Sequence, residues 1–231
     1  MKFSYRMRFS KTGRARFIAH LDTVSLLMRA VRRTGYEMAF TEGMRPKPIL
    51  SLAMPLGVGV EGEDEICDFS LNQRVPLKEL AQRISKELPE GIKLKSVGPV
   101  YERSKAAARV SSVTYRIELD HPQYDYQEAV SRYNARDSLV ILRKRPKGDK
   151  QIDLKKYVPK VDLDKEGRGI VFDMRVTEEG TGRPEEVVRA LAGIAGRELR
   201  AARVVRTGIG LKEEKATVPA RGRPGSGQRR G

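Results

Sequence analysis

Hydrophobic positions along the chain follow two spacings, and the switches between them predict the order of the elements. Residues 2–9 alternate between apolar and polar side chains, which is typical of a strand with one buried face. Over residues 20–33 the apolar side chains recur every three or four positions, which predicts an amphipathic helix ended by Gly35. Two extended segments, a helix and a strand should follow, at residues 36–60, 65–72, 75–91 and 92–100.

This order is typical of a ferredoxin-like unit, in which two helices cover one face of a four-stranded antiparallel sheet. The same order of strands and helices returns at residues 112–120, 122–135, 138–146, 169–176, 183–199 and 202–210. We therefore expect an α+β chain of two tandem ferredoxin-like units, each an antiparallel sheet with helices on one face. The expected boundaries are 1–103 for the first unit, 104–111 for a linker, 112–211 for the second unit and 212–231 for a disordered basic tail.

The charge balance narrows the classes of partner. The chain has 46 Lys and Arg against 30 Asp and Glu, a net charge of +16 and a pI near 10.1. Such an excess favours a polyanionic partner, with nucleic acid ahead of an acidic membrane surface, while a merely solvated charged surface is the alternative. Aromatic residues make up only 6% and Trp is absent, which argues against a site built mainly on base stacking.

The basic residues gather in the first strand and its turn, in the loop around Pro46, and in residues 143–160. Pro46 and Pro48 stiffen the loop that presents two cations, and each phosphate that such cations neutralise releases counterions. Glycines precede the helix at 183–199, so its free N–H groups could hold a phosphate beside Arg183, with capping by Thr181 as the alternative. The candidate contacts to RNA phosphates are Arg6, Arg8, Lys11, Arg14, Arg16, Arg45, Lys47, Arg143, Lys144, Arg145, Lys147 and Arg183.

His20 is the only candidate catalytic residue, and three interpretations of it stay open. Imidazole suits proton transfer near neutral pH, so His20 could act as a general acid or base in metal-independent RNA cleavage. It could instead donate a hydrogen bond to a phosphate or a base. It could also serve only at the start of its helix, where exposed N–H groups need partners.

Several other motifs exclude functions more than they suggest them. Cys67 is the only cysteine, which excludes an internal disulfide and any cysteine-rich metal cluster held by this chain alone. Residues 57–62, "GVGVEG", match G-x-G-x-x-G but precede a predicted strand, so we interpret them as a hairpin connection and not as a dinucleotide site. The acidic group within residues 61–65 could bind Mg²⁺, or it could neutralise the basic surface from within the chain. We expect no cofactor.

No apolar run approaches the length of about 18 residues that spans a bilayer, and the N-terminus has no apolar core of a signal peptide. We therefore expect no membrane contact and a cytoplasmic location.

The strings "FSKTGRARFIAHLD", "RAVRRTG" and "TEGMRPKPILSLAMPLGVGVEGEDE" resemble an uncharacterised bacterial family of radical-SAM-associated, or radical-SAM-linked, proteins. The resemblance is strong over residues 3–70 and becomes one of pattern from about 110 to 211, where "RKRPKGDKQIDLKKYV" looks like the family's Lys-and-Asp segment. Members occur alone or fused behind a radical SAM module. This chain lacks the CxxxCxxC motif of that module, so the resemblance implies the associated domain alone, and it implies no activity.

These observations lead to one preferred function and two alternatives. The preferred function is an RNA-binding accessory protein that acts on rRNA or tRNA, or with a radical SAM enzyme. The first alternative is a metal-independent endoribonuclease that uses His20, by analogy with the crRNA-processing enzymes of CRISPR systems, which share the expected fold. The second is a protein-interaction module for a radical SAM partner without RNA contact.

Overall fold

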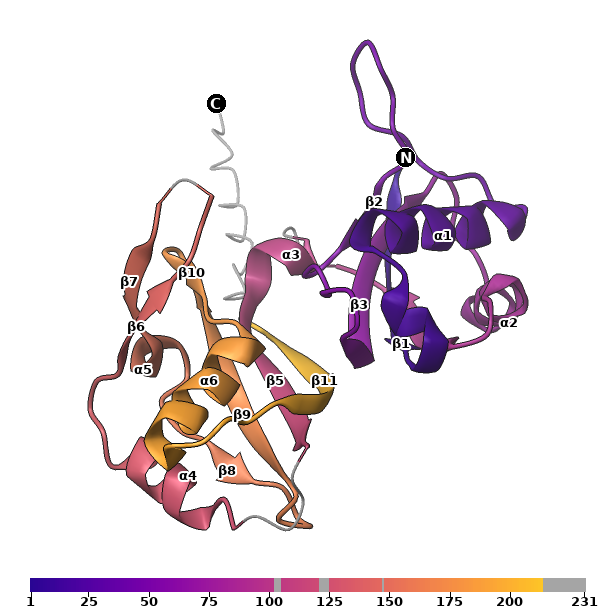
Figure 1. The fold of residues 1–231 in the computed structure, drawn as a ribbon. Coiled ribbons are helices and arrows are strands. Elements are labelled where there is room, and N and C mark those ends of the chain that lie inside the picture. Colours follow the sequence, from indigo (N-terminus) through magenta and orange to yellow (C-terminus); the bar gives the residue numbers. More distant parts are fainter. Residues whose placement is uncertain (102–104, 121–124, 147, 214–231) are drawn as a thin grey trace, which may run out of the picture.

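The computed structural model describes residues 1–101, 105–120, 125–146 and 148–213, and it shows a mixed α+β fold with six α-helices in that part of the chain (Figure 1). The first half holds, in order, β1 (Phe3–Lys11), a 3-10 turn (Gly13–Phe17), α1 (His20–Arg33), β2 (Leu50–Leu52), β3 (Glu61–Leu71), α2 (Leu77–Glu87) and β4 (Ile92–Pro99). These strands lie in the order β4-β1-β3, with the short β2 paired to β3, and all of these pairings are antiparallel. The predicted helix at 20–33 and the strands at both ends of this half are confirmed.

The core of the first half lies between one sheet face and both helices. Met7 and Phe9 of β1 are 0% and 1% exposed, and they share a cluster with Leu27 of α1 and Ile84 of α2. Gly91 enters β4 with φ of 83°, a conformation that favours glycine. A Cβ at Gly91 would lie 2.7 Å from the Thr12 carbonyl oxygen, so only glycine lets the chain pass this close to the turn after β1.

The second half begins with α3 (Ala106–Arg109) and β5 (Val110–Leu119), so residues expected to form a linker are part of a helix and a strand. The elements that follow are α4 (Gln127–Asn134), β6 (Val140–Arg143), β7 (Lys150–Asp153), α5 (Leu154–Tyr157), β8 (Asp162–Leu163), β9 (Gly169–Thr177), β10 (Gly180–Thr181), α6 (Pro184–Ala195) and β11 (Ala201–Leu211). Most of the expected tail, residues 214–231, lies outside the described residues.

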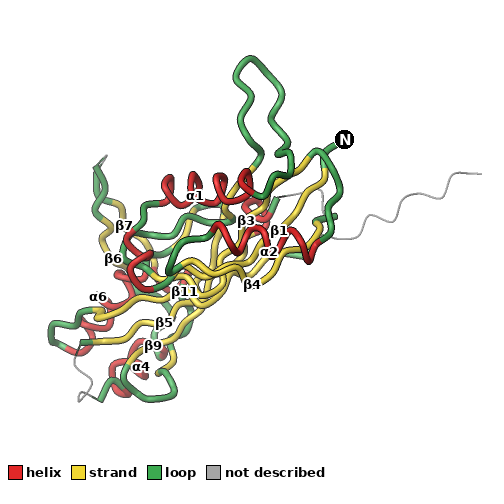
Figure 2. Tube along the Cα trace, turned by 90° about the vertical axis from the view of Figure 1, so that its right-hand side faces the viewer, coloured by secondary structure: helices red, strands yellow, loops and turns green. Residues whose placement is uncertain are grey.

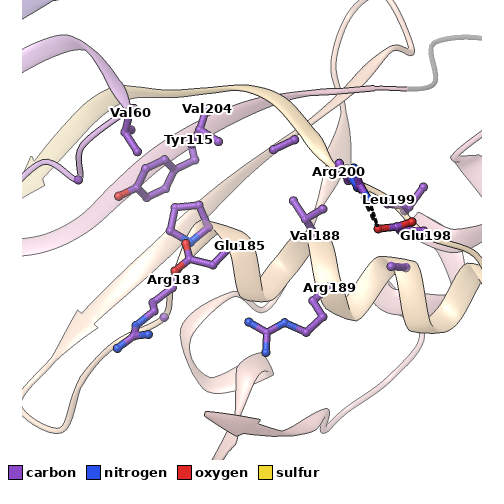
Figure 3. A pocket seen from close by; sticks show the side chains of 15 residues that line it. Val60, Tyr115, Arg183, Glu185, Val188, Arg189, Glu198, Leu199, Arg200 and Val204 are labelled. Carbon is purple, nitrogen blue, oxygen red and sulfur yellow. Dashed lines mark hydrogen bonds and ion pairs between the residues drawn. The ribbon is translucent and has the colours of Figure 1, made fainter. Parts of the chain in front are cut away.

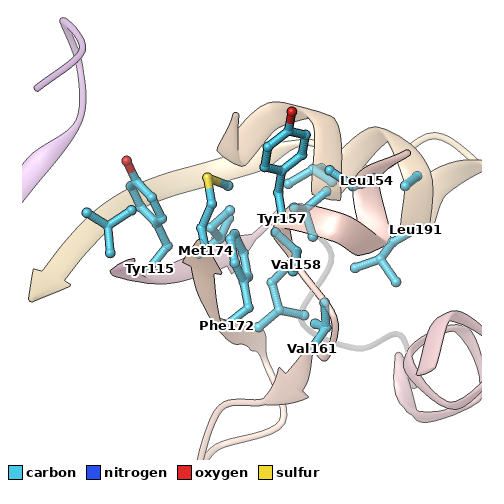
Figure 4. Close-up of a cluster of buried hydrophobic side chains, with 14 of the residues drawn as sticks. Tyr115, Leu154, Tyr157, Val158, Val161, Phe172, Met174 and Leu191 are labelled. Carbon is cyan, nitrogen blue, oxygen red and sulfur yellow. The ribbon is translucent and has the colours of Figure 1, made fainter. Parts of the chain in front are cut away.

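A second core fills the space between β5, β9 and their helices (Figure 4). Phe172 and Met174 of β9 belong to the same cluster as Leu191 of α6, and Val158 lies between them. Val158 and Val161, just after α5, are fully buried in the same cluster. The segment around residue 155, which the sequence marked only as a run of charges, therefore also supplies core residues.

Both halves contribute to one nine-stranded sheet, with the path β10-β9-β5-β11-β3-β1-β4. The halves meet where β11 runs parallel to β3, and this pairing has only two residue pairs, Val205 with Glu61 and Arg206 with Gly62. All other strand pairings in the described residues are antiparallel. Figure 2 shows the strands passing continuously from one half to the other.

One predicted strand has a different partner from the one expected. Residues 138–146 were expected to join the second sheet, but β6 pairs only with β7 in a separate two-stranded sheet. The position next to β9 is taken by the short β8 instead. Val140 and Leu142 on β6 are 59% and 51% exposed, so this apolar run is not a buried central strand. It is one strand of a hairpin, in which the backbone N–H and C=O groups find partners in the neighbouring β7. Residues 36–40, expected to be extended, make only isolated bridges through Met38 and Phe40.

No α-helix within the described ranges is long and apolar enough to cross a membrane.

Cys67 offers a direct test of this packing. It is 0% exposed on β3, and burial, helped by the neighbouring Asp68 charge, raises the pKa of its thiol. Because only the thiolate reacts with iodoacetamide, we expect Cys67 to stay unmodified at neutral pH in the folded protein and to react fully in guanidinium. Mass spectrometry of the intact chain measures this, and rapid labelling of the native protein would contradict the buried placement.

Candidate nucleic-acid interface

Carboxylates along β3 pair with basic side chains of the chain itself. Each of the five lies within ion-pair distance of an arginine, and the pairs are Arg16–Glu61, Arg116–Glu63, Arg8–Asp64, Arg206–Glu65 and Arg6–Asp68. Among the described residues no group of three or more His, Cys, Asp and Glu side chains could hold a metal ion. Of the two interpretations of the acidic group at 61–65, the structure thus favours neutralisation of the basic surface from within.

The basic face of β1 is occupied by these pairs. Arg6 and Asp68 are direct neighbours across the β1–β3 ladder, and Arg6 Nε and Nη2 donate to the carboxylate at 2.7 and 3.0 Å. The same carboxylate accepts the Ala106 N–H at 2.7 Å, which ties the start of α3 to β3. Arg8 pairs with Asp64. Arg6 and Arg8 were predicted to contact phosphates, but in the structure their guanidinium groups pair with carboxylates of β3.

Lys11 lies on the buried side of β1, which corrects the expectation that it faces a phosphate. The strand continues to residue 11, so Lys11 has the same parity as Met7 and Phe9, and only 1% of it is exposed. Its Nζ donates to the carbonyl oxygen of Ile18 at 2.8 Å, and burial lowers the pKa of its ammonium. Lys11 thus stabilises the turn after β1 through buried hydrogen bonds to backbone carbonyl oxygens of that turn.

Arg14 and Arg16, the other two cations of that turn, differ in their surroundings. Arg16 is half-buried, donates to Glu61 at 3.2 Å and stacks over the ring of Phe17 at 4.8 Å. Arg14 is exposed. Of the three turn cations, Arg14 is the one that solvent reaches most freely.

Arg143 is buried and corrects a second expectation. Its guanidinium donates to both Glu186 carboxylate oxygens at 2.6 Å and to the Thr181 carbonyl oxygen at 3.0 Å. Glu186 in turn accepts the Arg183 N–H at 2.9 Å, so a carboxylate of the chain caps α6 where an external phosphate was one option. Thr181, the expected cap, donates its hydroxyl to the Arg175 carbonyl oxygen instead. The Arg183 side chain remains exposed.

Two projecting segments hold Arg45, Lys47, Lys144 and Arg145, four of the exposed cations that the sequence singled out. The first arm, residues 41–47, carries Arg45 and Lys47, and it is closed at its base because the Thr41 N–H donates to the Lys47 carbonyl oxygen at 2.9 Å. The second arm, residues 144–146 and 148–150 between the strands of the β6–β7 hairpin, carries Lys144 and Arg145. Lys147, also predicted to contact RNA, lies outside the described residues.

The two arms project toward the same side of the molecule. In Figure 1 the loop before β2 and the β6–β7 hairpin both extend upward, and the view turned by 90° in Figure 2 shows the same. Arg143 fixes the base of the second arm to α6 through Glu186, and Pro46 and Pro48 stiffen the first. Both arms therefore present their cations from anchored bases.

His20 begins α1, and its Nδ1 is buried without a hydrogen-bond partner. It lines a cavity of about 10 Å³ together with Lys11 and Glu65, which is room for one water and not for a phosphodiester. This geometry does not support Nδ1 as a base acting on RNA.

A larger cavity of about 670 Å³ lies between α6 and β11 of the second half, and Gly57 and Val60 of the first half complete its lining (Figure 3). Val60, from the segment before β3, Tyr115 of β5 and Val204 of β11 lie at one end, and Val188 of α6 lies further along the helix. Arg200 and Glu198, paired at 2.7 Å, lie at the other end. Arg183, Glu185 and Arg189 line the α6 side of the mouth, and the two guanidinium groups extend outward from it.

Comparison with protein families gives a match over most of the chain. Residues 4–187 match the family described as "Uncharacterized protein conserved in bacteria (DUF2344)". The chain belongs to this family. Membership agrees with the resemblance seen in the sequence insofar as both point to an uncharacterised bacterial family.

Other comparisons add little. No curated protein matches the chain. Among solved structures, the crystal structure of an unknown protein from Galdieria sulphuraria is similar over 87% of this chain and 98% of that chain, at 14% identity and a TM-score of 0.28. At that score the likeness carries no argument about fold or function.

Sequence reasoning missed the residues that join the halves. Arg206 is 1% exposed; its Nε and Nη2 donate to Glu65 at 2.9 and 2.5 Å, and Nη1 donates to the Pro55 carbonyl oxygen at 2.9 Å. A signal existed, since Arg206 directly follows Val204 and Val205 in a strand, where a charge requires a buried partner. Nothing local to the sequence identifies Glu65, 141 positions away, as that partner.

The Arg206–Glu65 pair yields a stability prediction. Arg206→Met leaves the Glu65 charge buried and unpaired, so we expect the free energy of unfolding to fall by about 3–5 kcal/mol. The double variant Arg206→Met/Glu65→Met should lose clearly less than the sum of the two single variants. Urea unfolding measures all three, with Arg200→Met, which breaks an exposed pair, as a control that changes stability by less than about 1 kcal/mol. Additive losses would contradict a coupled pair.

Glu61 yields a pH prediction. Hydrogen bonds from Arg203 and, less strongly, from Arg16 lower the pKa of its carboxyl below the ordinary value of 4.5, and Glu61 is 2% exposed. A carboxyl whose pKa is lower in the folded state stabilises the protein above the unfolded pKa, and this stabilisation is lost as the pH falls through the folded pKa. Glu61→Gln should be less stable at pH 7 and should lose less stability between about pH 5 and pH 3 than the wild type. The exposed Glu90→Gln serves as control; identical acid profiles for wild type and Glu61→Gln would contradict the assignment.

Proposed function

We propose that this protein binds structured RNA, such as rRNA or tRNA, and presents it to an enzyme in the cytoplasm. The observation that carries the proposal is the position of the exposed cations, with Arg45 and Lys47 on one arm and Lys144 and Arg145 on another. The arms extend to the same side and are anchored at their bases. Two stiff cationic loops at a distance from each other suit the phosphates of a folded RNA better than a single compact anion.

The distribution of ion pairs favours the two arms, and not the face of the sheet, as the RNA-binding surface. Arg6 and Arg8 on the solvent side of β1 pair with carboxylates of β3, and Ser4 and Ser10 are the other residues of β1 on that side. An RNA-binding sheet of the RRM type instead uses aromatic residues to stack bases. The net charge of +16 remains after internal pairing, because every such pair is neutral. Arg45, Lys47, Lys144 and Arg145 on the arms carry part of this excess.

We further infer that each half is a ferredoxin-like unit. In support, β4-β1-β3-β2 in the first half and β11-β5-β9-β8 in the second have the strand order of that unit, with the helices of each half packed against its sheet. The two units then join edge to edge at β3 and β11. Separate units joined in this way would hold the two arms at a fixed spacing.

The enzyme partner is proposed from the sequence alone. The resemblance of residues 3–70 to radical-SAM-associated proteins supports a radical SAM enzyme that modifies the bound RNA. In this proposal the present chain supplies recognition, and the partner supplies the chemistry.

RNA binding across a salt series tests the proposal. Because each lost phosphate contact reduces the log–log salt slope by about 0.7–0.9, Arg45→Ala/Lys47→Ala and Lys144→Ala/Arg145→Ala should each reduce it by about 1.5. Filter binding or fluorescence anisotropy with tRNA and an rRNA hairpin measures the slope. Lys78→Ala/Lys86→Ala removes two exposed charges from α2 and is the matched control.

Equal salt slopes for the arm variants and the control would show that RNA contacts a surface other than the arms. Absence of RNA binding by the wild type, with co-purification of a partner that survives nuclease, would instead support a protein-interaction module.

A further inference from the structure

The cavity of about 670 Å³ between α6 and β11 has the size and lining of a small-molecule site, and its apolar walls take no part in the ion pairs described above. Its apolar walls come from three separate parts of the chain: Val60 before β3, Val188 and Ala192 on α6, and Val204 on β11. The middle stays open partly because Ala192 and Ala201, which also line it, are small. A helix and a strand thus face each other across a space suited to a flat, apolar group.

Polar groups gather at the mouth and not on the floor. Arg183 and Arg189 are exposed on the α6 side, and neither side chain pairs with a carboxylate in the described part of the chain. Arg200 is already neutralised by Glu198. Two unpaired guanidinium groups at the entrance of an apolar slot match a ligand with a planar apolar part and an anionic part beside it.

The second arm leads to this mouth. Arg143, at the base of the arm, donates to Glu186, and Glu186 accepts the N–H of Arg183. Lys144 and Arg145 follow Arg143 directly in the chain. The base of the second arm therefore lies next to Arg183 at the mouth.

We propose that the cavity binds one nucleotide, with its base between α6 and β11 and its phosphate at Arg183 and Arg189. Glu185 at the mouth accepts a hydrogen bond from an exocyclic amino group, so uracil, which has none, binds most weakly. The nucleotide is an unstacked residue of the bound RNA or a free mononucleotide. The first of these sources rests on the proposed function, and the second does not.

Two probes separate the sources. Titration calorimetry with AMP, GMP, CMP and UMP measures free nucleotides, and a single-stranded RNA that carries one 2-aminopurine reports a base that leaves the stack by its fluorescence. Ala192→Phe fills the cavity, and Arg189→Glu reverses one charge at the mouth. Arg29→Glu, on the exposed face of α1, is the matched charge control, and Ala195→Phe places the same ring on α6 outside the cavity lining.

We expect Ala192→Phe and Arg189→Glu each to weaken the nucleotide signal at least tenfold, while Arg29→Glu and Ala195→Phe leave it within about twofold. Loss with the mononucleotides identifies a free-nucleotide site, and this result stands even if RNA binding by the arms fails. Loss confined to the 2-aminopurine RNA identifies a base of the bound RNA. Wild-type signals in both cavity variants, or no nucleotide signal in the wild type, overturn the proposal and leave arm-dependent RNA binding intact. Thermal unfolding of every variant identifies any that fails to fold, and Arg189→Glu at an exposed position then decides alone.

Discussion

The bidentate pair between Arg206 and Glu65 is the contact on which the joining of the two halves depends. The backbone joins them through only two residue pairs of β3 and β11, which is little for a sheet of this size. Arg206 adds donors to Glu65 and to carbonyl oxygens of the segment before β3, all inside the protein. Gly62, opposite Arg206, has no side chain because a Cβ there would lie 2.5 Å from the Glu65 carboxylate. The β3–β11 pairing, the lack of a side chain at Gly62 and the Arg206–Glu65 ion pair therefore depend on one another.

This joint also determines which cations can meet a partner. Glu61 takes Arg16 and Arg203, and Glu63 takes Arg116, so carboxylates of β3 neutralise arginines of both halves. Basic residues next to β3 stabilise the fold, whereas basic residues on the arms have no carboxylate nearby in the sheet. High net charge and many internal ion pairs are thus compatible, because each pair is neutral and the excess of basic residues remains.

Local patterns predicted most helices and strands but not the partners of strands or charges. The bounds of α1 follow from apolar spacing alone, and the alternation of β1 is confirmed through Phe9. The same alternation, continued by two residues, would have placed Lys11 inside; the glycine of the following turn suggested an earlier end. The apolar run of β6 was recognised from the sequence, yet its pattern does not show whether this strand pairs with β9 or with β7. In the structure β8 pairs with β9, and β6 pairs with β7. Arg143 shows the same limit, because its carboxylate partner lies 43 positions away.

The cavity and the joint share their supporting residues, and this has a consequence for binding. Val60 directly precedes Glu61, Val204 lies between Arg203 and Val205, and Tyr115 lies opposite Arg206 in the β5–β11 ladder. A ligand between α6 and β11 would touch mainly the second half, and Val60 would add a contact from the first half while β3 and β11 stay paired. By linkage, anything that binds the joined form and not the separated form stabilises the joint by the same free energy. Arg206 fixes the spacing of the two halves, whereas each arm keeps its own anchor within its half.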